Sequence, residues 1–349
     1  MIAERWLLFE PLDTVTVRDG RPFDAGQDSV ARTVLPSPTT LGGAVGAAYG
    51  AAPGAGLRAD ARGVEVPSRL AGPFTVTGDG RVVWPVPRDV VVTDAGTAVP
   101  PERLRVKTVV PDGVVDDLRP CSGRLVGDGD PVEGWWDLRA LQGYLSMGKV
   151  SPDYRREPPW KVERRVGLAG EDGGGAADGL LYATEHLRLD PGAGFAVRCL
   201  DGPDVPPART VAFGGRGRGA QVRELAAPAL PEPAATATGG RLLLYLATPA
   251  VFTGGWLPDL SVWPGCELVA AATGGPQVIT TITADRFTGG FRGRGRLLWA
   301  VPAGGVYYLR FPSETAALAA ARALAREPLR QAEETLATAG FGWTFTGSW

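Results

Sequence analysis

The chain has 349 residues, with 36 Lys or Arg against 38 Asp or Glu and a formal net charge of −2, which excludes a protein that binds nucleic acid through an overall basic field. Its length corresponds to roughly two domains. A hydrophobic content of 44% is typical of a globular protein, and no uninterrupted apolar run approaches the ~20 residues of a membrane span.

The cysteines and the N-terminus indicate a cytoplasmic protein without membrane contact. Cys121, Cys199 and Cys266 are far apart and odd in number, as expected of reduced thiols. The first residues lack the charged and apolar regions of a signal peptide. We therefore expect a cytoplasmic location.

The first 50 residues predict a strand, a polar loop and a capped helix. Residues 4–10 are bulky and apolar, and the loop that follows carries Arg18 and Arg21. In residues 35–49, Ser37 or Thr39 can cap a helix whose small residues allow close packing. The helix start is either an anion site made of N–H groups and hydroxyls or an ordinary capped helix.

Residues 51–189 predict short strands and long loops, with one helix and one long strand. Residues 135–144 have helical spacing, residues 170–179 are typical of a turn or loop, and residues 180–189 predict a strand. Residues 154–165 are rich in basic side chains with two aromatic ones interleaved: Arg155, Arg156, Lys161, Arg164 and Arg165, with Tyr154 and Trp160. This pattern fits either single-stranded nucleic acid or a solvated charged surface.

The most distinctive stretch is residues 213–223, where four glycines and three arginines occur with no acidic residue before Glu224. Glycine permits positive φ and close approach of a ligand, and the arginine fork fits phosphate oxygens. The Lys-Ser/Thr of a P-loop is missing, and prolines after Glu224 exclude the long helix of a dinucleotide-binding turn. The stretch therefore predicts contact with a polyanion backbone, with a solvated hairpin tip as the alternative.

The remaining residues repeat the same pattern of strands, a helix and a Gly/Arg loop. Residues 227–240 contain three prolines and predict a linker. Strands are predicted at residues 241–248, 277–283, 296–301, 306–311 and 340–345, and helices at 312–326, capped by Ser313, and 333–338. A second Gly/Arg loop, residues 287–296, carries Arg292 and Arg294. The class is α+β, with a duplicated sheet arrangement.

The sequence lacks the residues of the common catalytic and metal sites. His186 is the single histidine, cysteines are not paired, and no acidic cluster has metal-ligand spacing, so we expect no metal, no cofactor and no Ser-His-Asp triad. His186 lies in an alternating strand, where a structural role is favoured over a role as general base.

Several short motifs occur in an order that resembles one protein family. These motifs are residues 18–23 (Arg-Asp-Gly-Arg-Pro-Phe), 35–44 (Leu-Pro-Ser-Pro-Thr-Thr-Leu-Gly-Gly-Ala), 163–168 (Glu-Arg-Arg-Val-Gly-Leu), 179–182 (Gly-Leu-Leu-Tyr), 214–218 (Gly-Gly-Arg-Gly-Arg), 248–258 (Thr-Pro-Ala-Val-Phe-Thr-Gly-Gly-Trp-Leu-Pro) and 301–307 (Val-Pro-Ala-Gly-Gly-Val-Tyr). Together they resemble the third Cmr subunit of type III-B CRISPR effector complexes, within the RAMP superfamily. The match spans nearly the whole chain.

The resemblance implies two ferredoxin-like (RRM-like) domains of the RAMP type and no catalysis. The first domain would comprise residues 1–226 with insertions at about 51–160, followed by the linker 227–240 and a second domain at 241–349. The implied partners are the 5′ tag of the crRNA, the large Cas10-like subunit and a backbone RAMP subunit. An endoribonuclease that uses His186 remains the alternative, because some relatives cleave repeat RNA.

One position departs from the family pattern: Arg216 stands where the family commonly has an acidic residue after the glycine pair. This change alters a protein contact or strengthens RNA binding, depending on what the position faces. The predicted RNA-binding residues are Arg18, Arg21, Ser37, Thr39, Thr40, Gly42, Arg164, Gly214, Gly215, Arg216, Gly217, Arg218, Arg223, Arg292 and Arg294.

Overall fold

The computed structural model of the chain describes residues 4–18, 30–51, 64–93, 100–107, 121–170, 176–203, 207, 210–215, 217–281 and 296–349. The chain divides into two compact units, and each is described by itself. Unit 1 comprises Met1–Gly80, Pro159–Ala226 and Val278–Leu298, and unit 2 comprises Arg81–Pro158, Ala227–Gln277 and Trp299–Trp349. Each unit is therefore built from three separate segments of the chain. The domain boundaries at 226 and 241 remain a prediction.

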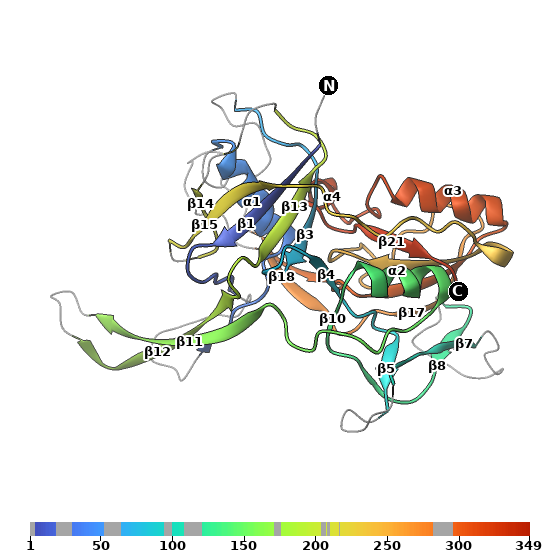
Figure 1. Ribbon diagram of the computed structural model, residues 1–349, viewed down its shortest axis with the longest axis horizontal. Coiled ribbons are helices and arrows are strands. Elements are labelled where there is room, and N and C mark those ends of the chain that lie inside the picture. Colours follow the sequence, from blue (N-terminus) through green and yellow to red (C-terminus); the bar gives the residue numbers. More distant parts are fainter. Residues whose placement is uncertain are drawn as a thin grey trace. The chain divides into compact units, whose positions relative to one another are not determined.

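The described residues form a mixed α and β structure, mostly strands in several sheets, with four α-helices (Figure 1). The strands of unit 1 are β1 (Arg5–Pro11), β2 (Val30–Ala31), β3 (Leu70–Val76), β11 (Trp160–Gly170), β12 (Ala176–Leu189), β13 (Gly194–Cys199), β14 (Thr210–Ala212) and β15 (Gly219–Leu225). Its helix is α1 (Pro38–Ala48).

The main strands of unit 1 lie in the order β3-β13-β1-β15-β14, and all neighbours among them are antiparallel. Trp6, Leu7, Leu8 and Phe9 are all buried, because β1 is a central strand covered on both faces. The helix α1 contacts β3 and β14 and contributes its apolar side to the core around Phe9.

A long antiparallel hairpin, β11–β12, belongs to the same unit (Figure 1). The short strand β2 pairs with β12 in parallel. Val15, which follows β1 in the chain, forms an isolated antiparallel bridge with Leu187 of β12. This bridge brings the segment that follows β1 against the base of the hairpin.

Unit 2 contains a second antiparallel sheet, with strand order β17-β20-β16-β21. These strands are β16 (Arg241–Leu246), β17 (Glu267–Ala272), β20 (Val306–Arg310) and β21 (Thr344–Gly347). Its helices are α2 (Leu138–Met147), α3 (Glu314–Leu324), α4 (Glu334–Ala339) and the 3-10 turn η1 (Thr238–Gly240). The buried side of α3 is part of the apolar core that covers this sheet.

Short strands complete the described structure. They are β4 (Val82–Pro85), β5 (Val90–Val92), β6 (Glu102–Arg103), β7 (Arg105–Lys107), β8 (Arg124–Val126), β9 (Asp130–Pro131) and β10 (Trp135–Trp136), together with the paired β18 (Gln277–Thr281) and β19 (Arg296–Ala300). None of the helices in the described part of the chain has the length and apolarity needed to cross a membrane.

The two units repeat one strand order. When the four strands β1, β3, β13 and β15 are numbered in chain order, the spatial order is second, third, first, fourth. The strands β16, β17, β20 and β21 give the same order. In unit 1 the helix α1 follows the first strand, and in unit 2 the helix α3 joins the third strand to the fourth.

Several predicted elements are confirmed, and three are corrected. Ser37 caps α1 and Ser313 caps α3, as predicted. The predicted helix at 135–144 begins later, because Trp135 and Trp136 pair with β4 and the Asp137 side chain caps α2. Residues 176–179 belong to a strand rather than a loop, while 171–175 lie outside the described residues.

The third correction concerns the last strand, which was expected over residues 340–345. The structure starts β21 at Thr344. Gly340 and Gly342 have φ values of 110° and 77°, which are incompatible with an extended strand. The backbone therefore turns after α4 before the strand begins.

Candidate functional site

The Gly/Arg loop is the tight connection between β14 and β15. The N–H of Phe213 donates to the Arg218 carbonyl (2.8 Å), and the N–H of Gly215 donates to the Thr16 carbonyl (2.8 Å). Gly214 has φ 79°, and a Cβ there would lie 2.8 Å from the Thr16 oxygen. Glycine is therefore required at this position by both conformation and space.

Both described arginines at this loop are held by acids from the β1 segment. Arg218 Nη1 donates to Asp13 Oδ2 at 2.6 Å, and Arg223 Nη2 donates to Glu10 Oε1 at 2.9 Å. The stretch contains no acidic residue in the sequence, but acids from another segment lie beside its arginines in space. The antiparallel pairing of β1 with β15 brings Glu10 and Asp13 to these arginines.

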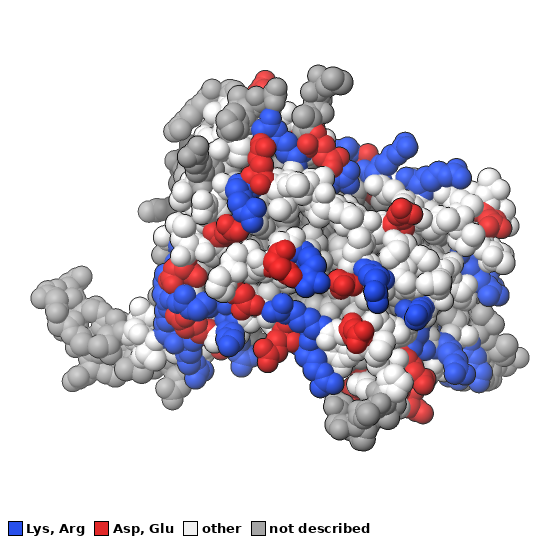
Figure 2. Space-filling model, in the orientation of Figure 1, with Lys and Arg blue, Asp and Glu red and all other residues white. Residues whose placement is uncertain are grey.

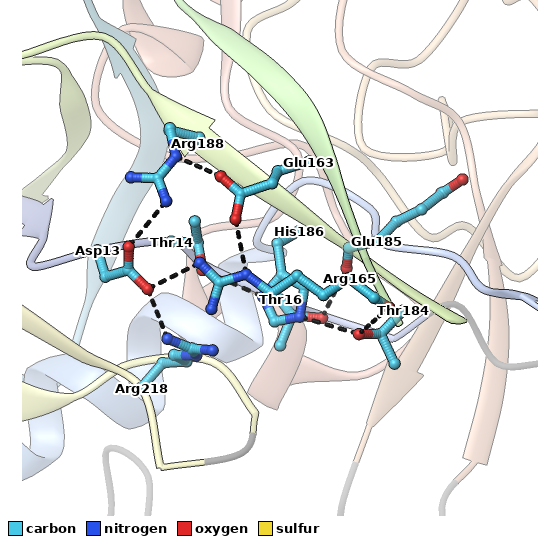
Figure 3. A network of polar contacts seen from close by, with 10 residues as sticks. All are labelled: Asp13, Thr14, Thr16, Glu163, Arg165, Thr184, Glu185, His186, Arg188 and Arg218. Carbon is cyan, nitrogen blue, oxygen red and sulfur yellow. Dashed lines mark hydrogen bonds and ion pairs between the residues drawn. The ribbon is translucent and has the colours of Figure 1, made fainter. Parts of the chain in front are cut away.

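Asp13 is the centre of a larger group of charges, which we call the Asp13 cluster: Asp13, Glu163, Arg165, Arg188 and Arg218 (Figure 3). Arg165 Nη2 donates to Asp13 Oδ2 at 2.9 Å, and Arg188 Nη2 donates to Asp13 Oδ1 at 3.0 Å. The Nε groups of Arg165 (2.6 Å) and Arg188 donate to Glu163. Three guanidinium groups and two carboxylates give the cluster a net charge of +1.

Both carboxylates of the cluster are ionised at neutral pH. The hydrogen bond from Arg165 is the main cause that lowers the pKa of Asp13, and hydrogen bonds from Arg188 and then Arg165 lower the pKa of Glu163 to about 2. Glu163 in turn raises the pKa of both Arg165 and Arg188. The side chains remain partly exposed, with 42% of Asp13 and 26% of Arg218 accessible, so the cluster is open to solvent.

The sequence prediction chose Arg164, but the alternation of β11 puts its neighbour in the cluster. Successive strand residues point to opposite faces, so Arg165 shares the face of Glu163, while Arg164 is exposed on the other face opposite Glu185. Arg165 belongs to the basic stretch at residues 154–165 but was not chosen as a site residue, and Asp13, Glu163 and Arg188 were missed. The sequence offered one signal for Arg188. In the strand predicted at 180–189, side chains two positions apart share a face, so Arg188 lies on the same face as His186.

His186 is buried beneath this cluster. Only 1% of the residue is exposed, and its Nδ1 and Nε2 lie 3.1 Å from the hydroxyls of Thr14 and Thr184, respectively. A general base must come within hydrogen-bond reach of the proton it removes. Both ring nitrogens here face buried threonines, which is the environment of a structural histidine.

The start of α1 has its hydroxyls bonded to one another. The Thr40 N–H donates to Ser37 Oγ at 3.3 Å, and Ser37 Oγ lies 2.8 Å from Thr39 Oγ1 and 3.1 Å from Thr40 Oγ1. Ser37 and Gly42 are buried, and the two threonines are half-buried. The capping role is confirmed, and anion binding stays a prediction.

The other predicted residues are placed as follows. Arg18 is exposed and forms a backbone bridge with Thr33. Arg21, Arg216, Arg292 and Arg294 lie outside the described residues. Figure 2 shows positive and negative side chains intermixed on the visible face, without a single-sign field over its described residues. Within the described part of the chain, no group of three or more His, Cys, Asp or Glu could hold a metal ion.

Comparison with known proteins identifies the family. The chain belongs to the family described as CRISPR-associated protein (Cas_Cmr3), whose model matches residues 7–349. This match confirms the family resemblance of the sequence motifs. No curated protein matches the chain at a significant level.

Two solved structures are similar over most of the chain. One is a chain of "Cryo-EM structure of the Type III-B Cmr-beta bound to cognate target RNA and AMPPnP, state 1", with 13% identity, a TM-score of 0.49, and coverage of 87% of this chain and 86% of that chain. The other is a chain of "Cryo-EM structure of the Type III-B Cmr-beta bound to cognate target RNA", with 14% identity, a TM-score of 0.46 and the same coverage.

Proposed function

We propose that this chain is a non-catalytic, RNA-binding subunit of a cytoplasmic type III-B CRISPR-Cas (Cmr) antiviral effector complex. Membership of the Cas_Cmr3 family over residues 7–349 supports the place in the complex. In that place the chain holds the 5′ tag of the crRNA and docks the large Cas10-like subunit and a backbone RAMP subunit.

The observation that carries the RNA contact is the convergence of Arg218 with Arg165 and Arg188. A loop that needs glycine for its backbone presents Arg218 beside two arginines from the hairpin. Each guanidinium has five N–H donors, and the carboxylates of the cluster accept only some of them. Partly exposed guanidinium groups of this kind bind phosphate oxygens.

The proposed RNA contacts extend beyond the Asp13 cluster. Arg223 lies on β15 directly after the loop, and Arg164 is exposed on the hairpin. The start of α1 with Ser37, Thr39, Thr40 and Gly42 and the exposed Arg18 are further proposed RNA contacts. Arg21, Arg216, Arg292 and Arg294 are also proposed as RNA contacts and lie outside the described residues.

The strand order supports two ferredoxin-like domains of the RAMP type. A β-α-β-β-α-β ferredoxin-like sheet has antiparallel neighbours and the spatial strand order second, third, first, fourth. Both units have this order. In chain order the first domain is residues 1–226, with insertions, and the second is residues 241–349, after the linker 227–240.

The test measures binding and cleavage on the same samples. Full-length protein is titrated into labelled guide RNA with its 5′ tag over a salt series, and we expect a steep fall of affinity with salt and intact RNA. Arg218→Ala should weaken binding, whereas Arg198→Ala, which removes an arginine paired with Glu4, is the matched control. Equal effects of the two variants would remove the loop from the site. Cleavage that disappears in His186→Ala would establish the endoribonuclease instead.

A further inference from the structure

The Asp13 cluster contains two carboxylates whose contacts differ in kind. Glu163 accepts from the Nε groups of Arg165 and Arg188, at the inner edge of each fork. Asp13 accepts from the terminal Nη2 groups of the same two arginines and from Nη1 of Arg218. In Figure 3 the three guanidinium groups surround the Asp13 carboxylate from different elements.

The Glu163 contacts keep the two hairpin arginines oriented without help from Asp13. Because Nε is fixed, the planar fork of each arginine can turn little, and its Nη2 group stays directed at the place of the Asp13 carboxylate. Both arginines also lie on the paired strands β11 and β12. The donors therefore remain positioned if the Asp13 side chain turns away.

The backbone on either side of Asp13 is held by hydrogen bonds that do not involve its carboxylate. The N–H of Leu12 donates to the Gly219 carbonyl at 3.0 Å, and Val15 exchanges hydrogen bonds with Leu187. The carboxylate is 42% exposed and lies at the surface. A rotation of one exposed side chain is enough to vacate the place between the arginines.

A carboxylate and a phosphodiester offer the same acceptors to arginine. Each carries one negative charge and two oxygens that a guanidinium fork binds. Without Asp13, the remaining four side chains carry a net charge of +2, because only the Glu163 carboxylate then balances the three guanidinium groups. This vacated place is suited to one backbone phosphate.

We propose that Arg165, Arg188 and Arg218 form a binding site for a single RNA phosphodiester, that Asp13 occupies this site in the free protein, and that RNA displaces it. The proposal rests on the proposed RNA-binding function and assigns two arginines and a competing acid that the sequence prediction did not include. Asp13 keeps the donors paired without RNA and makes binding weaker than the arginines alone would allow. Glu163 is the positioning residue.

The test is the affinity of Asp13→Ala for the tagged guide RNA over a salt series. Removal of the competing carboxylate should tighten binding by roughly threefold to tenfold and steepen the slope of log K against log salt by about one. Glu4→Ala is the matched control, since Glu4 pairs with Arg198 near the other end of β1 and its removal makes the same change in net charge. Asp13→Asn should act in the same direction as Asp13→Ala.

Three outcomes separate this proposal from the proposed function. Tighter binding by Asp13→Ala than by Glu4→Ala supports the displacement. If the arginine variants weaken binding while Asp13→Ala also weakens it or matches Glu4→Ala, the displacement is overturned and the RNA site stands. If the combined Arg165, Arg188 and Arg218 alanine variant binds as tightly as wild type, the RNA site itself fails.

Replacing single phosphates of the RNA by uncharged groups locates the phosphate that the three arginines bind. RNA in which a single tag phosphate is replaced by an uncharged methylphosphonate should bind wild type more weakly at one position. At that same position the replacement should have little further effect on the combined Arg165, Arg188 and Arg218 alanine variant, because the partners of the phosphate are already missing there. Additive losses at every position would contradict a single-phosphate site.

Discussion

Arg218 donates a 2.6 Å hydrogen bond to Asp13, although the two residues are 205 positions apart in the sequence. The pair joins the Gly/Arg loop after β14 to the segment after β1. Arg165 and Arg188 bind the same carboxylate, so three arginines from the loop and the hairpin meet at one exposed place.

The loop that carries Arg218 should depend on Gly214 more than on Gly217. Both have positive φ, but a Cβ at Gly214 would meet the Thr16 oxygen at 2.8 Å, whereas a Cβ at Gly217 would meet open space. We expect Gly217→Ala to cost about 1 kcal/mol of unfolding free energy and Gly214→Ala roughly 2–4 kcal/mol. Urea denaturation measures both, and equal losses would contradict the described turn.

His186 should contribute to stability and not to chemistry. His186→Ala leaves a cavity and removes the partners of the Thr14 and Thr184 hydroxyls, which are buried. We expect a loss of roughly 2–4 kcal/mol in unfolding free energy. Thermal and urea unfolding provide the measurement. A variant as stable as wild type would show that the histidine is not part of the core.

Asp89 in unit 2 should be among the most sensitive core positions. It is fully buried and accepts from the hydroxyls of Tyr144 and Tyr308 and from Arg103 Nε at 3.2 Å. Asp89→Ala leaves a mostly buried guanidinium without its carboxylate, and we expect a loss of about 3–5 kcal/mol. Tyr144→Phe removes only one hydroxyl and should cost about 1–2 kcal/mol. The reverse ranking in denaturant titrations would contradict this arrangement.

Alkaline pH should destabilise the fold through Cys199. Burial raises the pKa of this thiol to about 12. Between its ordinary value of about 8.5 and pH 12, the thiol is ionised in the unfolded chain and protonated in the folded one, so stability falls as pH rises, by up to about 1.4 kcal/mol per unit. The unfolding free energy, measured by denaturation between pH 8.5 and 10, should fall less steeply with pH in Cys199→Ala than in wild type. An unchanged slope would show that the thiol does not contribute.

The local features of the site could be predicted from the sequence, because they depend on neighbouring residues. The glycines of the loop, the Ser37 cap and most strands follow from conformational preference and apolar pattern. Arg218 was predicted as a site residue for the same reason. The repeated strand order of the two units agrees with the repetition seen in the sequence.

The partners in the site could not be predicted, because they depend on long-range pairing. Asp13 reaches Arg218 only through the β1–β15 ladder, and it reaches Arg188 only through the bridge between Val15 and Leu187. The choice of Arg165 over Arg164 requires the register of the hairpin, which one strand alone does not define.

The most direct test of the account is the affinity of the combined Arg165→Ala, Arg188→Ala and Arg218→Ala variant for guide RNA with its 5′ tag. Fluorescence anisotropy over a salt series compares it with wild type and with Arg198→Ala. We expect the triple variant to bind at least tenfold more weakly, with a shallower salt slope, and Arg198→Ala to stay close to wild type. Wild-type affinity in the triple variant, in a protein that unfolds like wild type, would contradict the account.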